Sequence, residues 1–107
     1  MKHGQIILKT IAVCMLAAAT HASAGDYAVA KKFALGGEGG WDYLSYDAPS
    51  NRLFITRGTR VQVVDPDKGV VVGEIRDTAG VHGVAIVGDS GKGYTSNGRD
   101  NSVSVFD

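Results

Sequence analysis

The sequence predicts an all-β protein built from antiparallel sheets of four short strands. The chain of 107 residues contains 15 glycines but only 2 prolines, and segments rich in Val, Ile, Thr, Tyr and Phe separate the glycines. This composition is typical of short strands joined by tight turns. In addition, the second half of the chain repeats the first at a spacing of about 40 residues. The 11 basic and 11 acidic side chains balance, so no general charge excess directs the chain to nucleic acid, which is not expected as a partner.

Residues 1–24 are predicted to be a helical signal peptide. Lys2 and Lys9 form a basic start, and residues 11–20 form an apolar run that is too short to cross a bilayer core of roughly 30 Å. Ala22, Ser23 and Ala24 then supply an A-x-A cleavage pattern. We therefore expect cleavage after Ala24 and a periplasmic or secreted protein. An uncleaved membrane anchor is the alternative.

Cleavage of the signal peptide would also remove Cys14, the single cysteine of the chain, which lies inside the apolar run. The mature chain then has no disulfide, and its stability must come from packing. Lipidation at Cys14 is an alternative, although the residue before it, Val13, is larger than that reaction normally requires. Without Lys2 and Lys9 the mature chain carries nine basic and eleven acidic side chains, and no membrane contact is expected after cleavage.

Residues 25–40 are predicted to form a leading strand, over residues 28–35, and a glycine-rich connection, over residues 36–40. Four further strands follow at turn-bounded intervals, over residues 43–47, 53–57, 61–65 and 70–75. The turn at residues 66–69 is the clearest signal, because proline presets φ and glycine accepts a positive φ. Strands joined by such short loops must pair antiparallel.

The repeat aligns the chain with itself over both halves. Gly40 corresponds to Gly80, Phe54 to Tyr94 and Gly58 to Gly98, at an offset of 40. After a two-residue insertion the offset becomes 42, as the pair Val61 and Val103 shows. A four-stranded sheet repeated in this way is the blade of a β-propeller, whose blades pack on both faces. A two-sheet sandwich is the structural alternative, but it gives no reason for the repeat to keep its register.

Two segments of the repeat resemble a known family. Residues 54–57 (FITR) and 94–97 (YTSN) take the position of the motif that names the YVTN-repeat propellers, and residues 100–107 look like their third strand. The chain thus resembles a YncE-like secreted β-propeller over residues 28–107. This resemblance implies a propeller of several blades, typically seven.

Under this interpretation residues 41–77 form one blade and residues 78–107 form a second blade that lacks its last strand. The chain is then an incomplete propeller of about two blades. We expect an N-terminal fragment whose remaining blades come from missing sequence, with a ring of several chains as the alternative. Two blades alone would leave two apolar faces and a strand edge in water.

The candidate site is a ligand-binding surface at the channel mouth formed by Trp41, Asp42 and His82. His82 is the only histidine of the mature chain, and the repeat places it opposite Asp42. Both residues stand at the entrance to a blade's first strand, which lines the central channel of a propeller. They are expected to line a pocket at the channel mouth with Trp41 as a stacking surface, or else to close turns by hydrogen bonding. One histidine and one carboxylate are too few for zinc, so no metal or other cofactor is expected.

Other motifs do not carry chemistry in this context. Ser90, in the segment GDSG, lacks a base within reach and is expected to lie in a hairpin turn. The glycines of residues 36–40 lack the strand, turn and helix of a dinucleotide site. The sequence therefore predicts no catalytic residue.

The expected function is an exported, non-catalytic propeller module that binds a small molecule or a protein. The resemblance keeps two enzymatic alternatives open, a lactonase-like hydrolase and an accessory propeller subunit of a periplasmic dehydrogenase. A purely structural surface protein is a third alternative. A cluster of channel-facing His, Asp or Glu in the missing blades would indicate an enzyme.

Signal cleavage gives the first prediction. We expect the exported chain to begin at Gly25, as measured by intact mass and N-terminal sequencing of the secreted or periplasmic fraction. Ala22→Phe should block processing because the peptidase accepts only a small side chain at this position. Ser23→Phe, the matched control at the tolerant middle position, should still be cleaved. A full-length exported chain would contradict the prediction.

Overall fold

The computed structural model describes residue 25 and residues 27–107, so the predicted signal peptide at residues 1–24 lies outside the described residues. The chain divides into two units, residues 1–30 and residues 31–107. The described residues of the first unit have no regular secondary structure. No helix in the described part of the chain has the length and apolar character needed to cross a membrane.

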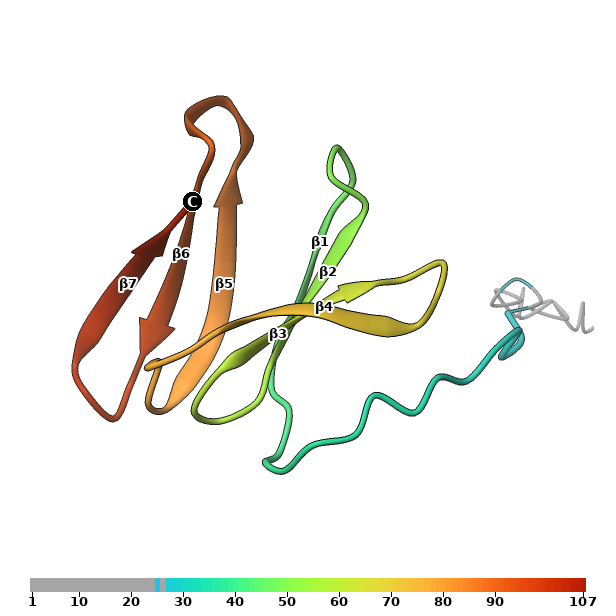
Figure 1. Ribbon diagram of the computed structural model, residues 1–107, viewed down its shortest axis with the longest axis horizontal. Helices are drawn as coiled ribbons and strands as arrows, with labels where there is room; N and C mark the ends of the chain where they lie inside the picture. The colour runs from blue at the N-terminus through green and yellow to red at the C-terminus, as the bar shows by residue number, and fades with distance from the viewer. Residues whose placement is uncertain (1–24, 26) are drawn as a thin grey trace, which may run out of the picture. The chain divides into compact units, whose positions relative to one another are not determined.

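The second unit consists of two antiparallel sheets (Figure 1). The first sheet contains β1 (Leu44–Asp47), β2 (Arg52–Thr56), β3 (Val61–Asp65) and β4 (Val70–Ile75), in that order. The second contains β5 (Val81–Val87), β6 (Lys92–Asn97) and β7 (Ser102–Phe106). A single 3₁₀ turn, η1 (Gly88–Ser90), joins β5 to β6. The predicted all-β fold class is confirmed, and Ser90 lies in the hairpin loop as expected.

The predicted repeat recurs in the pairing of the strands. In the first sheet Leu44 pairs with Ile55 and Phe54 pairs with Val63. In the second sheet the pairs are Val84 with Thr95 and Tyr94 with Val105. These positions are related by the same offsets of 40 and 42 that align the sequence. The first three strands of the two sheets therefore have the same order and the same register.

The leading strand expected over residues 28–35 is absent. Residues 27–35 contain no strand, and no described strand pairs with them. An extended segment needs a neighbour to satisfy its backbone groups, and the first sheet begins only at Leu44. The four strands expected over residues 43–75 are present, with β3 and β4 at the predicted bounds and β1 and β2 within one residue of them.

Each sheet has two faces, because successive side chains of a strand point to opposite sides. We call the two sides of the first sheet the Phe54 face and the Leu44 face. The equivalent sides of the second sheet are the Tyr94 face and the Val84 face. The Phe54 face carries Ser45, Phe54, Thr56, Val61 and Val63, and the Leu44 face carries Leu44, Tyr46, Leu53, Ile55, Gln62 and Val64. The Tyr94 face carries Ala85, Tyr94, Ser96, Val103 and Val105, and the Val84 face carries Val84, Ile86, Gly93, Thr95, Ser104 and Phe106.

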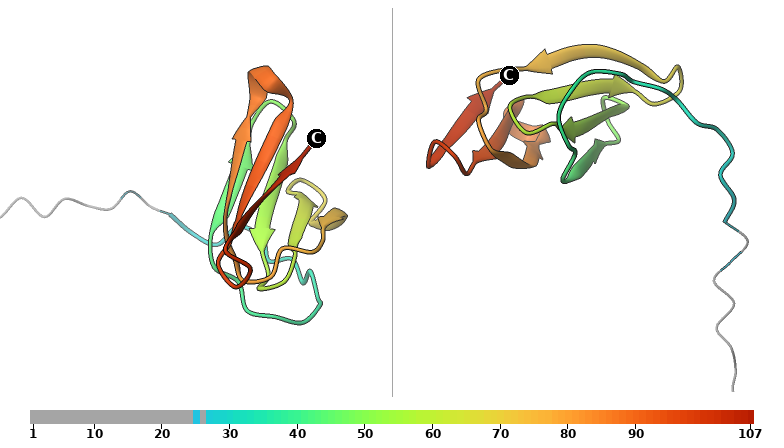
Figure 2. Two further views of the ribbon diagram at one scale, coloured as in Figure 1. Left: turned by 90° about the vertical axis from the view of Figure 1, so that its left-hand side faces the viewer. Right: turned by 90° about the horizontal axis from the view of Figure 1, so that it is seen from below.

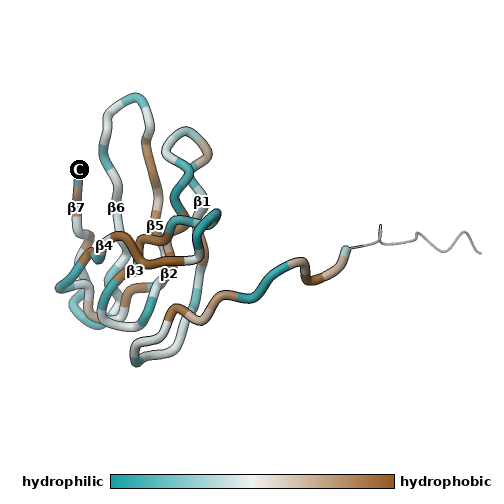
Figure 3. Tube along the Cα trace, turned by 45° about the vertical axis from the view of Figure 1, so that its right-hand side comes forward, coloured by the Kyte–Doolittle hydropathy of each residue, from teal (hydrophilic) through white to brown (hydrophobic). Residues whose placement is uncertain are grey.

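The two sheets stack through faces that are not equivalent. The buried cluster contains Phe54 and Val61 from the Phe54 face, and Val84, Ile86 and Phe106 from the Val84 face pack against it. The rings of Phe54 and Phe106 lie 6.1 Å apart, and Ser45 Oγ donates a hydrogen bond of 2.7 Å to the Val84 carbonyl. Figure 2 shows this stacking from two further directions, and Figure 3 shows the apolar stretches of β4 and β5 in brown.

Gly93 makes room for the aromatic contact between the sheets. A Cβ atom at this position would lie within 2.1 Å of the Phe106 ring, which covers the glycine. The equivalent pair in the first sheet is Leu53 and Val64. At this cross-strand position the first sheet has two medium-sized residues, and the second sheet has one small and one large residue. The combined volume of the pair is thus roughly kept, as expected in a closely packed interior.

Asp65 organises the turn from β3 to β4. Its Oδ1 accepts hydrogen bonds from the backbone N–H groups of Lys68 at 3.2 Å and of Asp67 at 3.1 Å. The first of these bonds is the main reason that the pKa of the Asp65 carboxyl is lowered, and the nearby charges of Lys68 and Arg52 add to it. Gly69 completes the reversal with a φ of 65°, a conformation that favours glycine.

The lowered pKa predicts a pH dependence of stability. A carboxyl whose pKa is lower in the folded state stabilises the fold at pH values above its unfolded pKa of about 3.9. We expect Asp65→Asn to reduce the free energy of unfolding at neutral pH. The difference from the wild type should shrink as the pH falls below about 4 and disappear once the folded carboxyl is protonated.

Urea unfolding between neutral and strongly acidic pH measures this difference. Asp89→Asn is the matched control, because Asp89 lies exposed in η1 and should change stability little at any pH. A wild-type advantage that persists undiminished in strong acid would contradict the assigned role of Asp65.

Candidate functional site

The start of β1 and the start of β5 meet at one end of the stacked sheets. Antiparallel neighbours alternate in direction, so the ends of β2, β4 and β6 and the starts of β3 and β7 lie at this same end. The backbone N–H of Tyr43 donates to the His82 carbonyl at 3.4 Å, and Gly58 forms an isolated bridge with Val81. These contacts place the residues just before β1 beside the first residues of β5.

Asp42 and His82 form a direct hydrogen bond at this end. The Nδ1 atom of His82 lies 2.6 Å from Oδ2 of Asp42. A carboxylate oxygen accepts hydrogen bonds, so Nδ1 carries the hydrogen in this contact. Both side chains are exposed, at 64% for His82 and 45% for Asp42. The structure thus brings these two repeat-equivalent residues together, and the pair is accessible to a molecule from solution.

Trp41, the third residue of the predicted site, lies in a different environment. It lines a shallow hollow of about 310 Å³ together with Phe33, Leu44 and Ile55. His82 borders another hollow, of about 300 Å³, beside Asn97 and Val103. The structure therefore brings Asp42 and His82 together, whereas Trp41 serves a neighbouring apolar surface.

The Asp42–His82 pair offers two groups to a metal ion. Among the described residues no cluster of three or more His, Cys, Asp or Glu side chains has a geometry that would hold a metal. Protein zinc sites use at least three such ligands. The arrangement is suited to accept and donate hydrogen bonds, with the imidazole and the carboxylate acting as a polar pair.

Arg57 is an anchoring residue that the sequence did not reveal. Its guanidinium donates to four successive backbone carbonyls of the glycine-rich connection, at distances between 2.9 and 3.4 Å; these belong to Gly36, Gly37, Glu38 and Gly39. It also donates to Oε1 of Gln62 at 3.1 Å. The glycine-rich connection is therefore wrapped around one side chain, directly before Trp41.

The repeat explains the place of Arg57. In the second sheet the corresponding residue is Asn97, whose Nδ2 donates to Oγ of Ser104 at 2.8 Å. Ser104 corresponds to Gln62, the partner of Arg57 in the first sheet. In both sheets the last residue of the repeated segment, residues 54–57 or 94–97, thus hydrogen-bonds to the next strand. The alignment of the two segments already showed that Arg57 is equivalent to Asn97. It did not reveal the anchoring role of Arg57, because a charged residue at a turn is ordinarily solvated.

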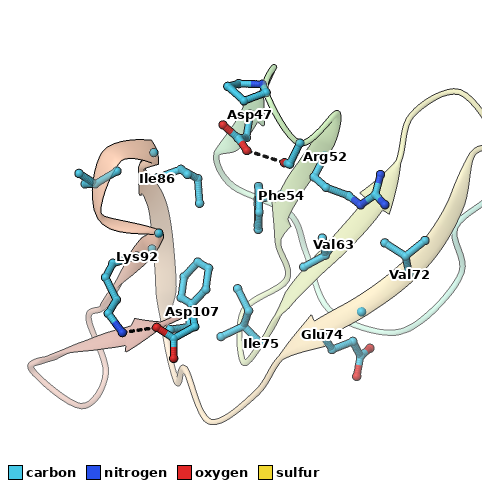
Figure 4. A pocket seen from close by; sticks show the side chains of 18 residues that line it. Asp47, Arg52, Phe54, Val63, Val72, Glu74, Ile75, Ile86, Lys92 and Asp107 are labelled. Atoms are coloured by element: carbon cyan, nitrogen blue, oxygen red, sulfur yellow. Dashed lines mark hydrogen bonds and ion pairs between the residues drawn. The ribbon is translucent and has the colours of Figure 1, made fainter.

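A groove of about 780 Å³ separates the outer parts of the two sheets (Figure 4). Phe54, Val63 and Ile75 line it from the first sheet, and Ile86 and Phe106 line it from the second. Its rim is charged and includes the ion pair between Lys92 and Asp107. In the described chain the second sheet has three strands and no equivalent of β4. Residues of β4, such as Val72 and Ile75, therefore line the groove from the first sheet only.

Comparison of the chain with models of known protein families, with curated proteins and with solved structures finds no significant match.

The contacts of Arg57 predict the effect of a conservative substitution. Arg57→Lys keeps the charge but removes the planar fork that bonds several carbonyls at once. We expect cleavage after Glu38 by a glutamate-specific protease to become about tenfold faster, because the loss of one or two hydrogen bonds of about 1 kcal/mol each eases local opening. Arg76→Lys is the matched control, since Arg76 is exposed and pairs only with Glu74 among the described residues. Equal cleavage rates in both variants would contradict the role of Arg57.

Proposed function

We propose that the protein is an exported, non-catalytic β-propeller module of the YVTN-repeat, YncE-like type that binds a ligand or a protein at the mouth of a channel. The observation that carries this proposal is the stacking of two sheets of equal register through unlike faces. The Tyr94 face, which is equivalent to the covered Phe54 face, keeps Val103 64% exposed, so the same head-to-tail contact can be repeated there. Repetition of such a contact produces a ring of blades when its rotation closes, as in a propeller.

The position of the Asp42–His82 pair supports binding at the axis of such a ring. Both residues stand where the first strand of each sheet begins, and the first strands of propeller blades line the central channel. Their exposure leaves hydrogen-bonding groups available to a ligand. The apolar hollow beside Trp41 adds a surface suited to a ring or an alkyl group.

Export is part of the proposal because of the A-x-A pattern that ends at Ala24. The mature chain would contain no cysteine and could form no disulfide. Its stability would therefore depend on packing, which is compatible with an oxidising compartment. We therefore place the binding surface in the periplasm or outside the cell.

Trp41 provides a test, because it is the only tryptophan and precedes Asp42 directly. The exported chain is titrated with small carboxylates, monosaccharides and lactones while Trp41 emission is recorded. We expect a saturable change with one of these classes, and at least tenfold weaker binding for His82→Ala, since the ligand loses a charged or polar partner worth about 1.5 to 3 kcal/mol.

Lactone hydrolysis in the same samples distinguishes binding from catalysis. Binding without turnover above the buffer rate agrees with the proposal, and Lys68→Ala serves as a control because Lys68 lies in the turn between β3 and β4. Hydrolysis that depends on His82 would overturn the non-catalytic assignment in favour of a lactonase-like enzyme. Unchanged ligand affinity in His82→Ala would remove the proposed site.

A further inference from the structure

We propose that the hollow between the β2–β3 turn and the β6–β7 turn is a binding site for a phosphate group. The hollow has a volume of about 280 Å³ and is lined by Glu38 and Gly39 of the glycine-rich connection, by residues 57–60 and by Arg99. The proposal goes beyond the function proposed above and does not depend on ligand binding at Asp42 and His82.

The hollow lies at the end of the stacked sheets where β2 and β6 end and β3 and β7 begin. Both turns that line it are found at the lower edge of Figure 1. Loops and strand ends form its walls, and both sheets contribute to them. It is therefore not one of the sheet faces that a neighbouring blade would cover.

Three guanidinium groups give the hollow a positive charge. Arg57, Arg60 and Arg99 line it together, and an arginine side chain stays protonated in proteins. The acceptors around Arg57 are backbone carbonyls and the amide oxygen of Gln62, which carry no net charge. Arg60 forms an ion pair with Glu74 at 3.1 Å. Among the described residues Arg57 and Arg99 form no ion pair, so their charges are available to attract an anion.

Arg60 and Arg99 also retain N–H groups that can donate to an anion. Arg60 uses its Nε atom for Glu74, and its two terminal nitrogens make no hydrogen bond to the described chain. The side chain of Arg99 is exposed, and Thr59 adds a hydroxyl group to the lining. The planar fork of a guanidinium matches the oxygens of a phosphate. A phosphate group held by Arg60 and Arg99 would thus connect the two sheets.

Backbone contacts fix the two turns before any ligand binds. The Gly80 N–H donates to the Gly58 carbonyl at 2.7 Å, and the Arg99 N–H donates to the Ala79 carbonyl at 3.2 Å. A Cβ atom on Gly80 would lie 2.5 Å from the Arg99 backbone nitrogen, so glycine permits this close approach. Both turns are therefore held against the same segment, residues 79–80. A site that is already ordered loses less free energy when it binds a ligand.

Glu38 is the acidic residue in the lining of the hollow. It forms no ion pair with an arginine in the part of the chain that the structure describes. Its negative charge opposes a bound phosphate because like charges repel. Removal of this charge should therefore strengthen binding, whereas removal of an arginine should weaken it.

The test is calorimetric titration of the purified exported chain with inorganic phosphate at constant ionic strength, because salt screens exposed charges. We expect saturable binding by the wild type. Arg99→Ala should bind about tenfold more weakly, since the phosphate loses charge-assisted hydrogen bonds, and Glu38→Gln should bind more tightly. A parallel titration with glycerol phosphate distinguishes the sources of the group: tighter binding than that of inorganic phosphate assigns the site to a phosphate ester, and weaker binding assigns it to the free ion.

Lys68→Ala is the matched control, because it removes one positive charge from the β3–β4 turn, at the other end of the first sheet. It should bind phosphate like the wild type, and so should His82→Ala if the site is separate from the Asp42–His82 pair. Circular dichroism checks that each variant is folded. A wild-type chain that binds no phosphate overturns the proposal, and so does an equal loss of affinity in Arg99→Ala and Lys68→Ala. Acetate that binds as tightly as phosphate would contradict the assignment to a phosphate group.

Discussion

The covering of the Phe54 face by the second sheet is the contact on which the rest of the structure depends. The apolar face of a sheet must be buried against another element, and Phe54 and Val61 are buried in the cluster against which Val84, Ile86 and Phe106 pack. Burial of each such side chain contributes roughly 1.5 to 3 kcal/mol. Hydrogen bonds fix the angle at which the sheets meet, notably those from Gly80 N at 2.7 Å and Val81 N at 3.3 Å to the Gly58 carbonyl.

This contact also creates the candidate site. Asp42 and His82 are 40 residues apart in the sequence and meet because equivalent ends of β1 and β5 are brought together by the stacking. Arg57 holds the segment that leads into Trp41, so the approach to the site is fixed from the side of the first sheet. The polar pair and the apolar hollow next to it are consequences of one packing arrangement.

Much of the fold could be predicted from the sequence, because the repeat and the turn residues carry information that is local or periodic. The antiparallel pairing followed from the short loops, and the offset of 40 gave the equivalence of Asp42 and His82 but not their direct contact. Other features depend on three-dimensional context. The carbonyls around Arg57 come from four residues whose backbone path no local pattern specifies, and Trp41 turns away from Asp42 although it is its neighbour. A leading strand over residues 28–35 had strand-like composition, but strand formation needs a pairing partner as well as composition.

The most direct measurement is of nuclear Overhauser effects between the two sheets in solution. The account predicts cross-peaks between the ring protons of Phe54 and Phe106, whose centroids lie 6.1 Å apart, and between Ser45 and Val84, which share a hydrogen bond. Sheets that each show their own strand-to-strand cross-peaks but none of these would contradict the account, because the repeats would then fold without stacking.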